Sequence, residues 1–325
     1  MSFRRKLNEY DLLKVFATLL VVIGHVTIRY NATSYPTIDT SIPQAITQYI
    51  YLFHMPLFMA LSGAIYKIGE NKYNQFSTFL VNKVLRLIVP YFFVGCFFLV
   101  PSIWLFQDWN SEDVLKQYEN LFLGQDCRHL WYLLALFEIF VAHYFFTKRC
   151  KIGYVVLLFS SIIVSTIYSY CLNFDLFSVN MAVRYYPYFI VGAILCKKKY
   201  SSQALMQYVL SAGLIAVILK LNHYVSIDIL FSIVWPIPII AFFIITANFI
   251  VKKYNFEDLG VRIMLEYCFP IYLFHVPIIY VFDKVLPFVN LPVTILLTII
   301  VSVIISIIIA IIIKLLHGKY LIGEK

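Results

Sequence analysis

The sequence predicts an all-α, polytopic integral membrane protein, a helical bundle of about ten transmembrane helices with both termini in the cytoplasm. Of its 325 residues, 62% are hydrophobic and only 13% are charged. Soluble domains carry about 25% charged residues, and so little polar side chain could not cover the surface of a soluble fold. The same composition excludes a disordered chain. Apolar runs such as 291–313 are continuous over about 20 residues, whereas membrane β-strands alternate apolar and polar positions.

Ten apolar segments of roughly 17–24 residues are long enough to cross a bilayer. In chain order they are 12–30, 48–67, 84–106, 129–147, 152–172, 181–197, 204–221, 229–250, 263–282 and 292–313. The first is longer than the ~7–15-residue core of a signal peptide, so we expect it to be retained as a helix. No break resembles a domain linker, and the main connections, 68–83 and 107–128, are short. The sequence therefore predicts one transmembrane domain over residues 1–325.

Positive charges orient these spans. With the N-terminus in the cytoplasm, 20 of the 26 Lys and Arg residues fall on the inner side, and six fall on the outer side: Arg29, Lys116, Arg128, Arg184, Lys220 and Lys284. Because short cytoplasmic loops are enriched in Lys and Arg, this distribution favours that topology. The net charge of +9 therefore reflects the orientation of the chain in the membrane. We expect membrane lipid as a partner and no nucleic acid. We expect the bacterial cytoplasmic (inner) membrane.

Four of the seven histidines fall at a similar depth near the outer face: His25, His54, His129 and His275. A single one of them could be an interfacial or hydrogen-bonded histidine. His25 lies inside a long apolar stretch of the first span, where an ionisable residue is expensive to bury and therefore indicates function. Imidazole suits a general base toward an alcohol, or a metal ligand.

A metal site is not expected. No HxxxH or HxxE spacing occurs, and Glu138 and Glu266 are the acidic residues well inside the spans, where each suits an ion pair or cap as well as a catalytic role. The six cysteines form no CxxC pair and lie mostly in or beside apolar runs, as expected for small buried hydrophobic residues.

Basic residues gather where the first and third spans begin. Lys14 enters the first span, and Lys83 and Arg86 are three residues apart at the start of the third. They could be positive-inside anchors. Alternatively, Lys and Arg at the mouth of a pocket suit a polyanionic, phosphate-bearing cofactor.

Several segments resemble the acyltransferase type 3 family of membrane-bound O-acyltransferases. Residues 10–14, Tyr-Asp-Leu-Leu-Lys, precede His25 by ten residues, which is similar to the family's Arg-x10-His pattern with Lys14 in place of arginine. Residues 53–63, with Phe-His-Met-Pro-Leu-Phe and Leu-Ser-Gly, resemble its second helix. The basic segment 79–91 resembles its loop into the third helix. His129-Leu-Trp-Tyr-Leu and the Tyr-Leu-Phe-His-Val-Pro of 272–277 resemble two further motifs. Together they extend over about residues 8–280, in the family's order.

The resemblance implies transfer of an acyl group, most often acetyl from cytoplasmic acetyl-CoA, to a sugar hydroxyl of a cell-surface polysaccharide or lipid-linked glycan. It implies His25 as the base and Lys14, Lys83 and Arg86 as the binding site for acetyl-CoA. Lys14 stands eleven residues before His25, about 16 Å along a helix, so the two cannot touch.

The residues expected to bind the acceptor are His54, His129, Trp131, Tyr132, Arg184 and His275. An aromatic belt at the membrane interface is the alternative for Trp131 and Tyr132. A transporter or flippase for a lipid-linked glycan or acyl donor is the competing function. We find no pairing of broken helices between two halves of the chain, which many transporters have.

Overall fold

The protein is described by a computed structural model that covers residues 7–30, 39–72, 75–106, 110–171, 176–196, 233–254, 259–285 and 290–324. The described residues form helices and no β-strand. The helices are α1 Glu9–Thr27, α2 Ser41–Ile68, α3 Phe76–Lys83, α4 Val89–Val94, α5 Val100–Phe106, α6 Ser111–Leu123, α7 Trp131–Tyr144, α8 Tyr154–Cys171, α9 Val179–Leu195, α12 Pro236–Tyr254, α13 Leu259–Val285 and α14 Leu291–Leu315. A short helical turn, Lys319–Ile322, follows α14.

Eight helical segments in the described part of the chain are long and apolar enough to cross a membrane. They correspond to the first five and the last three predicted spans, and they confirm an all-α polytopic membrane protein. The predicted sixth span is helix α9, which has only 17 residues. The predicted seventh span, 204–221, lies outside the described residues, as do positions 229–232 of the eighth.

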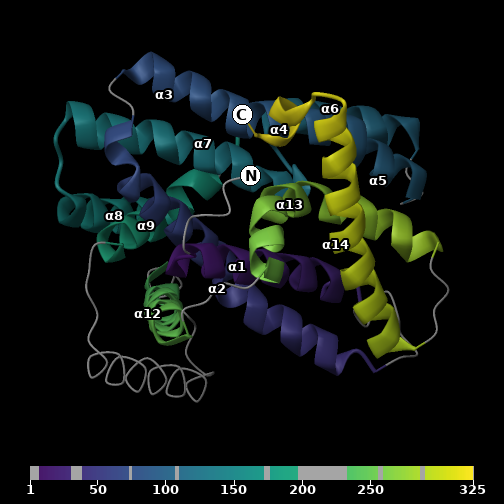
Figure 1. The fold of residues 1–325 in the computed structure, drawn as a ribbon. Helices are drawn as coiled ribbons and strands as arrows, with labels where there is room; N and C mark the ends of the chain where they lie inside the picture. Colours follow the sequence, from purple (N-terminus) through teal and green to yellow (C-terminus); the bar gives the residue numbers. More distant parts are fainter. Residues whose placement is uncertain are drawn as a thin grey trace.

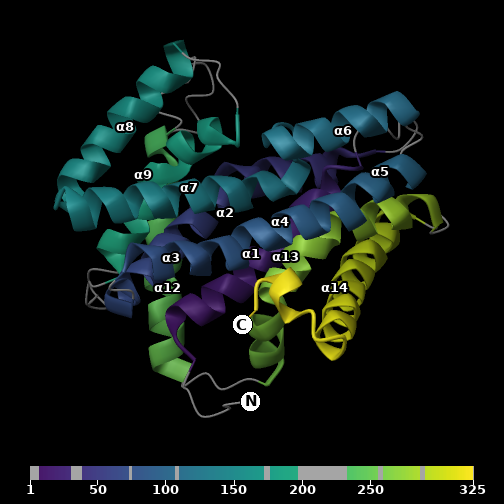
Figure 2. The same ribbon diagram turned by 90° about the horizontal axis from the view of Figure 1, so that it is seen from above.

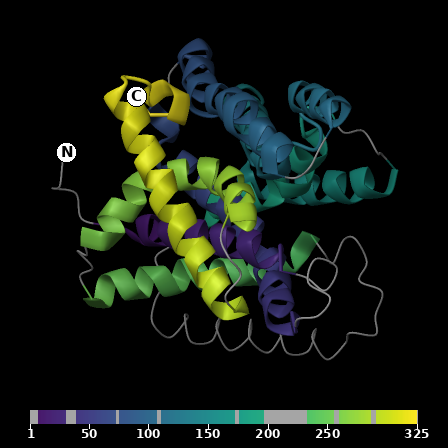
Figure 3. The same ribbon diagram turned by 90° about the vertical axis from the view of Figure 1, so that its right-hand side faces the viewer.

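Helix α1 runs through the middle of the bundle, between α2 and α13 (Figures 1 and 2), and it contacts α2, α12, α13 and α14. Figure 3 shows α14, in yellow, lying across the outside of the bundle. A row of small residues four apart forms its buried face: Thr294, Thr298, Ser302, Ser306 and Ala310. The central position of α1 places the side chains of His25 and Lys14 among those of the surrounding helices.

Helices α3, α4 and α5 join into one helical segment, Phe76–Phe106, through two wide π-helical turns. The turns are Val84–Ile88 and Gly95–Leu99, and each ends two residues before a proline, Pro90 or Pro101. Proline has no N–H to donate into the helix, so the regular ladder cannot continue unchanged. Arg86 lies in the first of these turns.

Helix α6 lies within the connection 107–128, where the sequence had predicted no helix. Asn110 caps it in a reciprocal arrangement with Asp113, and Gly124 ends it in a left-handed conformation. Asn8 and Asp11 form the same capping box at the start of α1. This Asn-x-x-Asp spacing was a readable signal for α6, because both side chains satisfy backbone N–H groups that a helix start leaves unpaired.

Helices α2 and α9 approach so closely that glycine is needed on both sides. A Cβ at Gly63 would collide with the carbonyl of Phe189, and a Cβ at Gly192 would collide with the carbonyl of Ala60. Small residues allow such backbone contacts in membrane bundles, where van der Waals packing drives association.

We expect Gly63→Ala to destabilise the protein by about 1–3 kcal/mol, because the added methyl group must push two helix backbones apart. Thermal unfolding of the purified protein in detergent measures the effect. Gly153→Ala is the matched control, since a Cβ there meets nothing within 4 Å. Equal stability of the two variants would contradict close packing of α2 against α9.

Candidate active site

Three of the histidines expected at similar depth come together in a cluster, which we call the histidine cluster: His25, His129 and His275. The ring centroids of His25 and His275 are 4.9 Å apart, and that of His129 lies 5.0 Å from His275 and 6.3 Å from His25. The cluster joins the last turn of α1, the short turn Arg128–Leu130 that leads into α7, and the middle of α13. His129 and His275 are buried, whereas His25 is only partly buried.

Hydrogen bonds fix the ring nitrogens of His275. Its Nδ1 lies 3.0 Å from the carbonyl of Ile271 and 2.8 Å from that of Tyr272. A carbonyl oxygen only accepts hydrogen bonds, so Nδ1 carries the proton and neutral His275 keeps a lone pair on Nε2.

His25 is oriented in turn by His275. The Nδ1 of His25 lies 3.1 Å from Nε2 of His275 and 3.0 Å from the carbonyl of Val21, so Nδ1–H donates toward two acceptors. The Nε2 of neutral His25 therefore carries the lone pair, and within the described part of the chain it has no hydrogen-bond partner. Such an atom is suited to accept a proton from a bound hydroxyl group.

His129 presents a second available nitrogen. Its Nε2 donates to the carbonyl of Leu273 at 3.1 Å, which leaves a lone pair on Nδ1. This Nδ1 is buried and has no hydrogen-bond partner among the described residues. The hydroxyl of Tyr272 donates to the backbone carbonyl of His129, so α13 holds the start of α7 in place.

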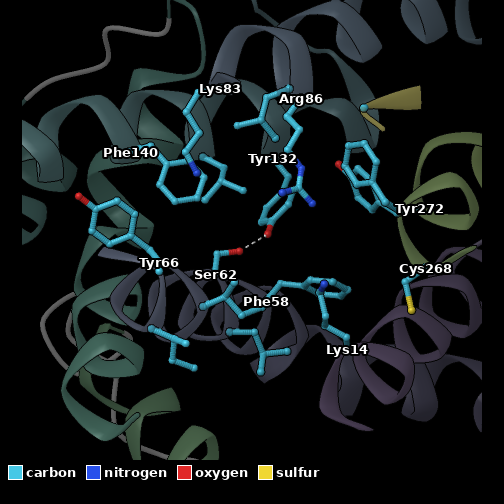
Figure 4. A pocket seen from close by; sticks show the side chains of 18 of the residues that line it. Lys14, Phe58, Ser62, Tyr66, Lys83, Arg86, Tyr132, Phe140, Cys268 and Tyr272 are labelled. Atoms are coloured by element: carbon cyan, nitrogen blue, oxygen red, sulfur yellow. Dashed lines mark hydrogen bonds between the residues drawn. The ribbon is translucent and has the colours of Figure 1, made fainter. Parts of the chain in front are cut away.

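A cavity of about 510 Å³ lies beside the histidine cluster, and none of the three histidines of the cluster lines it. We call it the basic cavity, because Lys14, Lys72, Lys83 and Arg86 line it together with Glu70, Glu266 and Glu324. Figure 4 shows Lys14 on one wall and Lys83 and Arg86 on the opposite wall, all directed into the space. The three basic residues predicted to bind acetyl-CoA thus line one cavity.

The acidic residues of the basic cavity are paired with lysines that do not line it. Glu70 binds Lys67 and lies 4.0 Å from Lys148. Burial raises the pKa of Glu70, but its hydrogen bond to Lys67 and the charges of both lysines outweigh burial and leave the pKa below its usual value. The carboxylate is therefore ionised at neutral pH, and its charge is offset by the two lysines.

The other two carboxylates share one lysine. Lys314 lies 2.8 Å from Glu324 and 3.4 Å from Glu266. The structural ion pair that was one interpretation of Glu266 is therefore present.

Lys83 and Arg86 stand on one wall of the cavity, opposite Lys14 (Figure 4). The ammonium of Lys83 lies 3.2 Å from the centre of the Phe140 ring, a cation–π contact. In the part of the chain that the structure describes, neither Lys83 nor Arg86 has a carboxylate partner. Arg86 is exposed, as a group at the mouth of a pocket must be if it is to meet a charged ligand.

Two tyrosines separate the basic cavity from the histidine cluster. Tyr132 and Tyr272 both line the cavity, with ring centroids 5.5 Å apart. The Tyr272 ring lies 5.6 Å from His129, and the hydroxyl of Tyr132 bonds Ser62 at 2.8 Å (Figure 4). Sequence reasoning missed Tyr272 and Ser62, although both fall in segments with a family resemblance.

The other residues predicted to bind the acyl acceptor lie in different parts of the structure. His54 is buried on α2, where its Nδ1 bonds the carbonyl of Ile50 at 2.8 Å. Trp131 packs against Tyr185 at 5.1 Å between ring centroids, and Arg184 is exposed. Among the described residues, no group of three or more His, Cys, Asp or Glu side chains is placed to hold a metal ion.

Comparison with known proteins identifies the family. A model described as an acyltransferase domain, Acyl_transf_3, matches residues 7–314, nearly the whole chain. No curated protein and no solved structure matches the sequence. The matched region includes the histidine cluster and nearly all of the basic cavity. The chain therefore belongs to the acyltransferase type 3 family and is a membrane acyltransferase.

Proposed function

We propose that the protein transfers an acetyl group from cytoplasmic acetyl-CoA to a sugar hydroxyl of a cell-surface polysaccharide or lipid-linked glycan, with His25 as the general base. The observation that carries the proposal is the hydrogen bonding of His25. Its Nδ1–H is committed to His275 and Val21, so Nε2 keeps an available lone pair on the one partly exposed ring of the histidine cluster.

The chemistry follows from that lone pair. Nε2 of His25 takes the proton of the acceptor hydroxyl while its oxygen attacks the thioester carbonyl carbon. The tetrahedral intermediate collapses with cleavage of the C–S bond, and His25 returns the proton to the departing CoA sulfur. During the step, the Nδ1–H of the His25 imidazolium continues to donate to His275, which stabilises the cation.

The basic cavity supports the donor assignment. Lys83 and Arg86 provide charge for the phosphates of CoA, and arginine is well suited to phosphate oxygens. Lys14 stands about 16 Å before His25 on α1. If the phosphates of CoA lie near Lys14, the pantetheine arm spans this distance and carries the thioester past Tyr132 and Tyr272 to His25. In this proposal the cavity faces the cytoplasm, as the positive-inside distribution favours, in a bacterial inner membrane with both termini inside.

Purified protein in lipid nanodiscs, supplied with radiolabelled acetyl-CoA and a panel of glycosides, tests the proposal. We expect label in an O-acetylated glycoside and release of free CoA in equal amounts. If CoA and glycosides remain unchanged while a solute crosses a sealed proteoliposome, the protein is a transporter and the proposal fails.

A further inference from the structure

The four chain segments that carry His25, His54, His129 and His275 also carry a set of polar residues, which lie on the far side of these histidines from the basic cavity. Along α1 and α13, the chain passes from the cavity residues Lys14 and Cys268 to the histidines and then onward. Along α2 and α7 the order is reversed, with the histidines before the cavity residues Ser62 and Tyr132. Residues after His25 and His275, and before His54 and His129, therefore lie at the same end of the bundle.

These positions hold what we call the Arg29–Asp283 cluster: Arg29, Tyr51, Asp126, Arg128, Tyr280 and Asp283. Arg29 Nε donates to Oδ2 of Asp283 at 2.5 Å, and the Arg29 guanidinium lies 5.2 Å from the centre of the Tyr280 ring. Tyr280 also interacts electrostatically with Asp283, Arg128 and Asp126. The cluster thus links α1, α13 and the loop that leads into α7.

The cluster begins beside the proposed base. Arg29 follows His25 by four residues, about 6 Å along the chain direction of α1. The Tyr51 ring centroid lies 6.2 Å from that of His25 and 4.7 Å from that of His54, and the Tyr51 side chain is 40% exposed. A sugar ring that places one hydroxyl at His25 would therefore have its other hydroxyls among the residues of the Arg29–Asp283 cluster.

One atom of the cluster lacks the partner that its chemistry requires. Oδ1 of Asp283 is buried and, among the described residues, has no hydrogen-bond partner, although Oδ2 is bound by Arg29. A carboxylate oxygen only accepts hydrogen bonds, and a buried one without a donor needs an explanation. A hydroxyl group of a ligand is such a donor.

The charges of the cluster favour a neutral ligand. Arg29 is paired with Asp283, and Arg128 lies 3.5 Å from Asp126, so each cation has its own carboxylate. A phosphate or a uronic acid would have to compete with these carboxylates. Hydroxyl groups are bound by the same side chains without disturbing the pairs, and the exposed Tyr51 ring offers an apolar face to a sugar ring.

We propose that the Arg29–Asp283 cluster binds the acyl acceptor, a neutral, hydroxyl-rich glycosyl group, with Asp283 Oδ1 accepting one of its hydroxyls and Tyr51 packing on its ring. This inference rests on the proposed function, since it places the acceptor next to the base assigned there.

Saturation-transfer NMR on the full chain in nanodiscs tests the proposal with methyl β-glucoside and methyl N-acetyl-β-glucosaminide as probes and methyl β-glucuronide as the anionic comparison. We expect the neutral glycosides to bind. Asp283→Asn and Tyr51→Ala should each weaken their binding about tenfold or more. In Asp283→Asn the amide oxygen must face the Arg29 donor, so an NH2 group that cannot accept a hydrogen bond takes the place of Oδ1, and Tyr51→Ala removes the ring. The matched control is Tyr49→Ala on the same helix, where the side chain is 53% exposed and its loss should leave binding unchanged.

Binding of acetyl-CoA, measured by calorimetry, shows that the variants are folded, and we expect it to stay within twofold of the unsubstituted protein. The proposal is overturned if no neutral glycoside binds, if only the glucuronide binds, or if Asp283→Asn and Tyr51→Ala bind the glycosides as well as Tyr49→Ala does. Should labelled acetyl-CoA still acetylate some other acceptor in that case, this assignment alone fails. Glycoside binding without any acetyl transfer contradicts the transferase proposal instead.

Discussion

Replacing His25 by alanine is expected to lower the rate of acetyl transfer at least about 100-fold while the protein inserts and accumulates normally. A positioned general base contributes roughly 10²–10⁴-fold to a rate, and alanine removes the proton acceptor entirely. Insertion is unaffected because a partly buried side chain is lost from one helix and no charge is added. Transfer of label from acetyl-CoA, normalised to the amount of protein in the membrane, gives the measurement.

His143→Gln is the control for this variant. His143 is also a buried histidine, with its Nδ1 3.1 Å from the hydroxyl of Tyr186 and its Nε2 3.4 Å from that of Tyr154. It belongs to α7, near the opposite end of that helix from His129. We expect His143→Gln to keep its turnover within a few-fold of the unsubstituted protein. Transfer by His25→Ala at the level of His143→Gln would remove His25 from the role of base.

The depth of His25 could be predicted from sequence, but its contact with His275 could not. Counting residues from the cytoplasmic side places four histidines at one level, since helix rise is constant at about 1.5 Å per residue. Which of these histidines touch depends on how each helix is rotated and on which helices pack together. His25 and His275 are 250 residues apart in the chain, and no local sequence pattern encodes a contact over that separation. The hydrogen bond that leaves Nε2 of His25 available therefore emerges only in the folded bundle.

Neighbouring residues of one motif illustrate the same limit. Trp131 and Tyr132 were assigned together, but successive residues on a helix point about 100° apart. Tyr132 faces the basic cavity and bonds Ser62, whereas Trp131 packs against Tyr185. Arg29 and Asp283 were likewise beyond sequence reasoning, because their pairing needs the register of α1 against α13.

The joint position of Lys83 and Arg86 was predicted from an α-helical spacing of three, yet the local helix is not regular. The wide turn Val84–Ile88 contains Arg86, and the proline that follows it was visible in the sequence. Lys83 lies against Phe140 and Arg86 remains exposed, so the two cations have different surroundings although both line the cavity. This difference makes Arg86 the better probe of phosphate binding.

Arg86→Ala is expected to raise the KM for acetyl-CoA about 10- to 100-fold and to leave kcat within a few-fold. A hydrogen bond to a charged group contributes about 1.5–3 kcal/mol, and each 1.4 kcal/mol is a factor of ten in affinity. The acetyl group and His25 are not touched by the change, so chemistry on the bound donor proceeds at a similar rate. Initial rates over a range of acetyl-CoA concentrations separate the two constants.

Arg149→Ala serves as the comparison, because Arg149 is exposed and, unlike Arg86, does not line the basic cavity. It should leave the KM unchanged. Free CoA adds a second criterion: it carries the same phosphates as acetyl-CoA, so its competitive inhibition constant should rise in Arg86→Ala by the same factor as the KM. A rise in the KM without a matching rise in that constant would mean that Arg86 acts on the acetyl end of the donor, and the assignment of the phosphates to this wall of the cavity would be wrong.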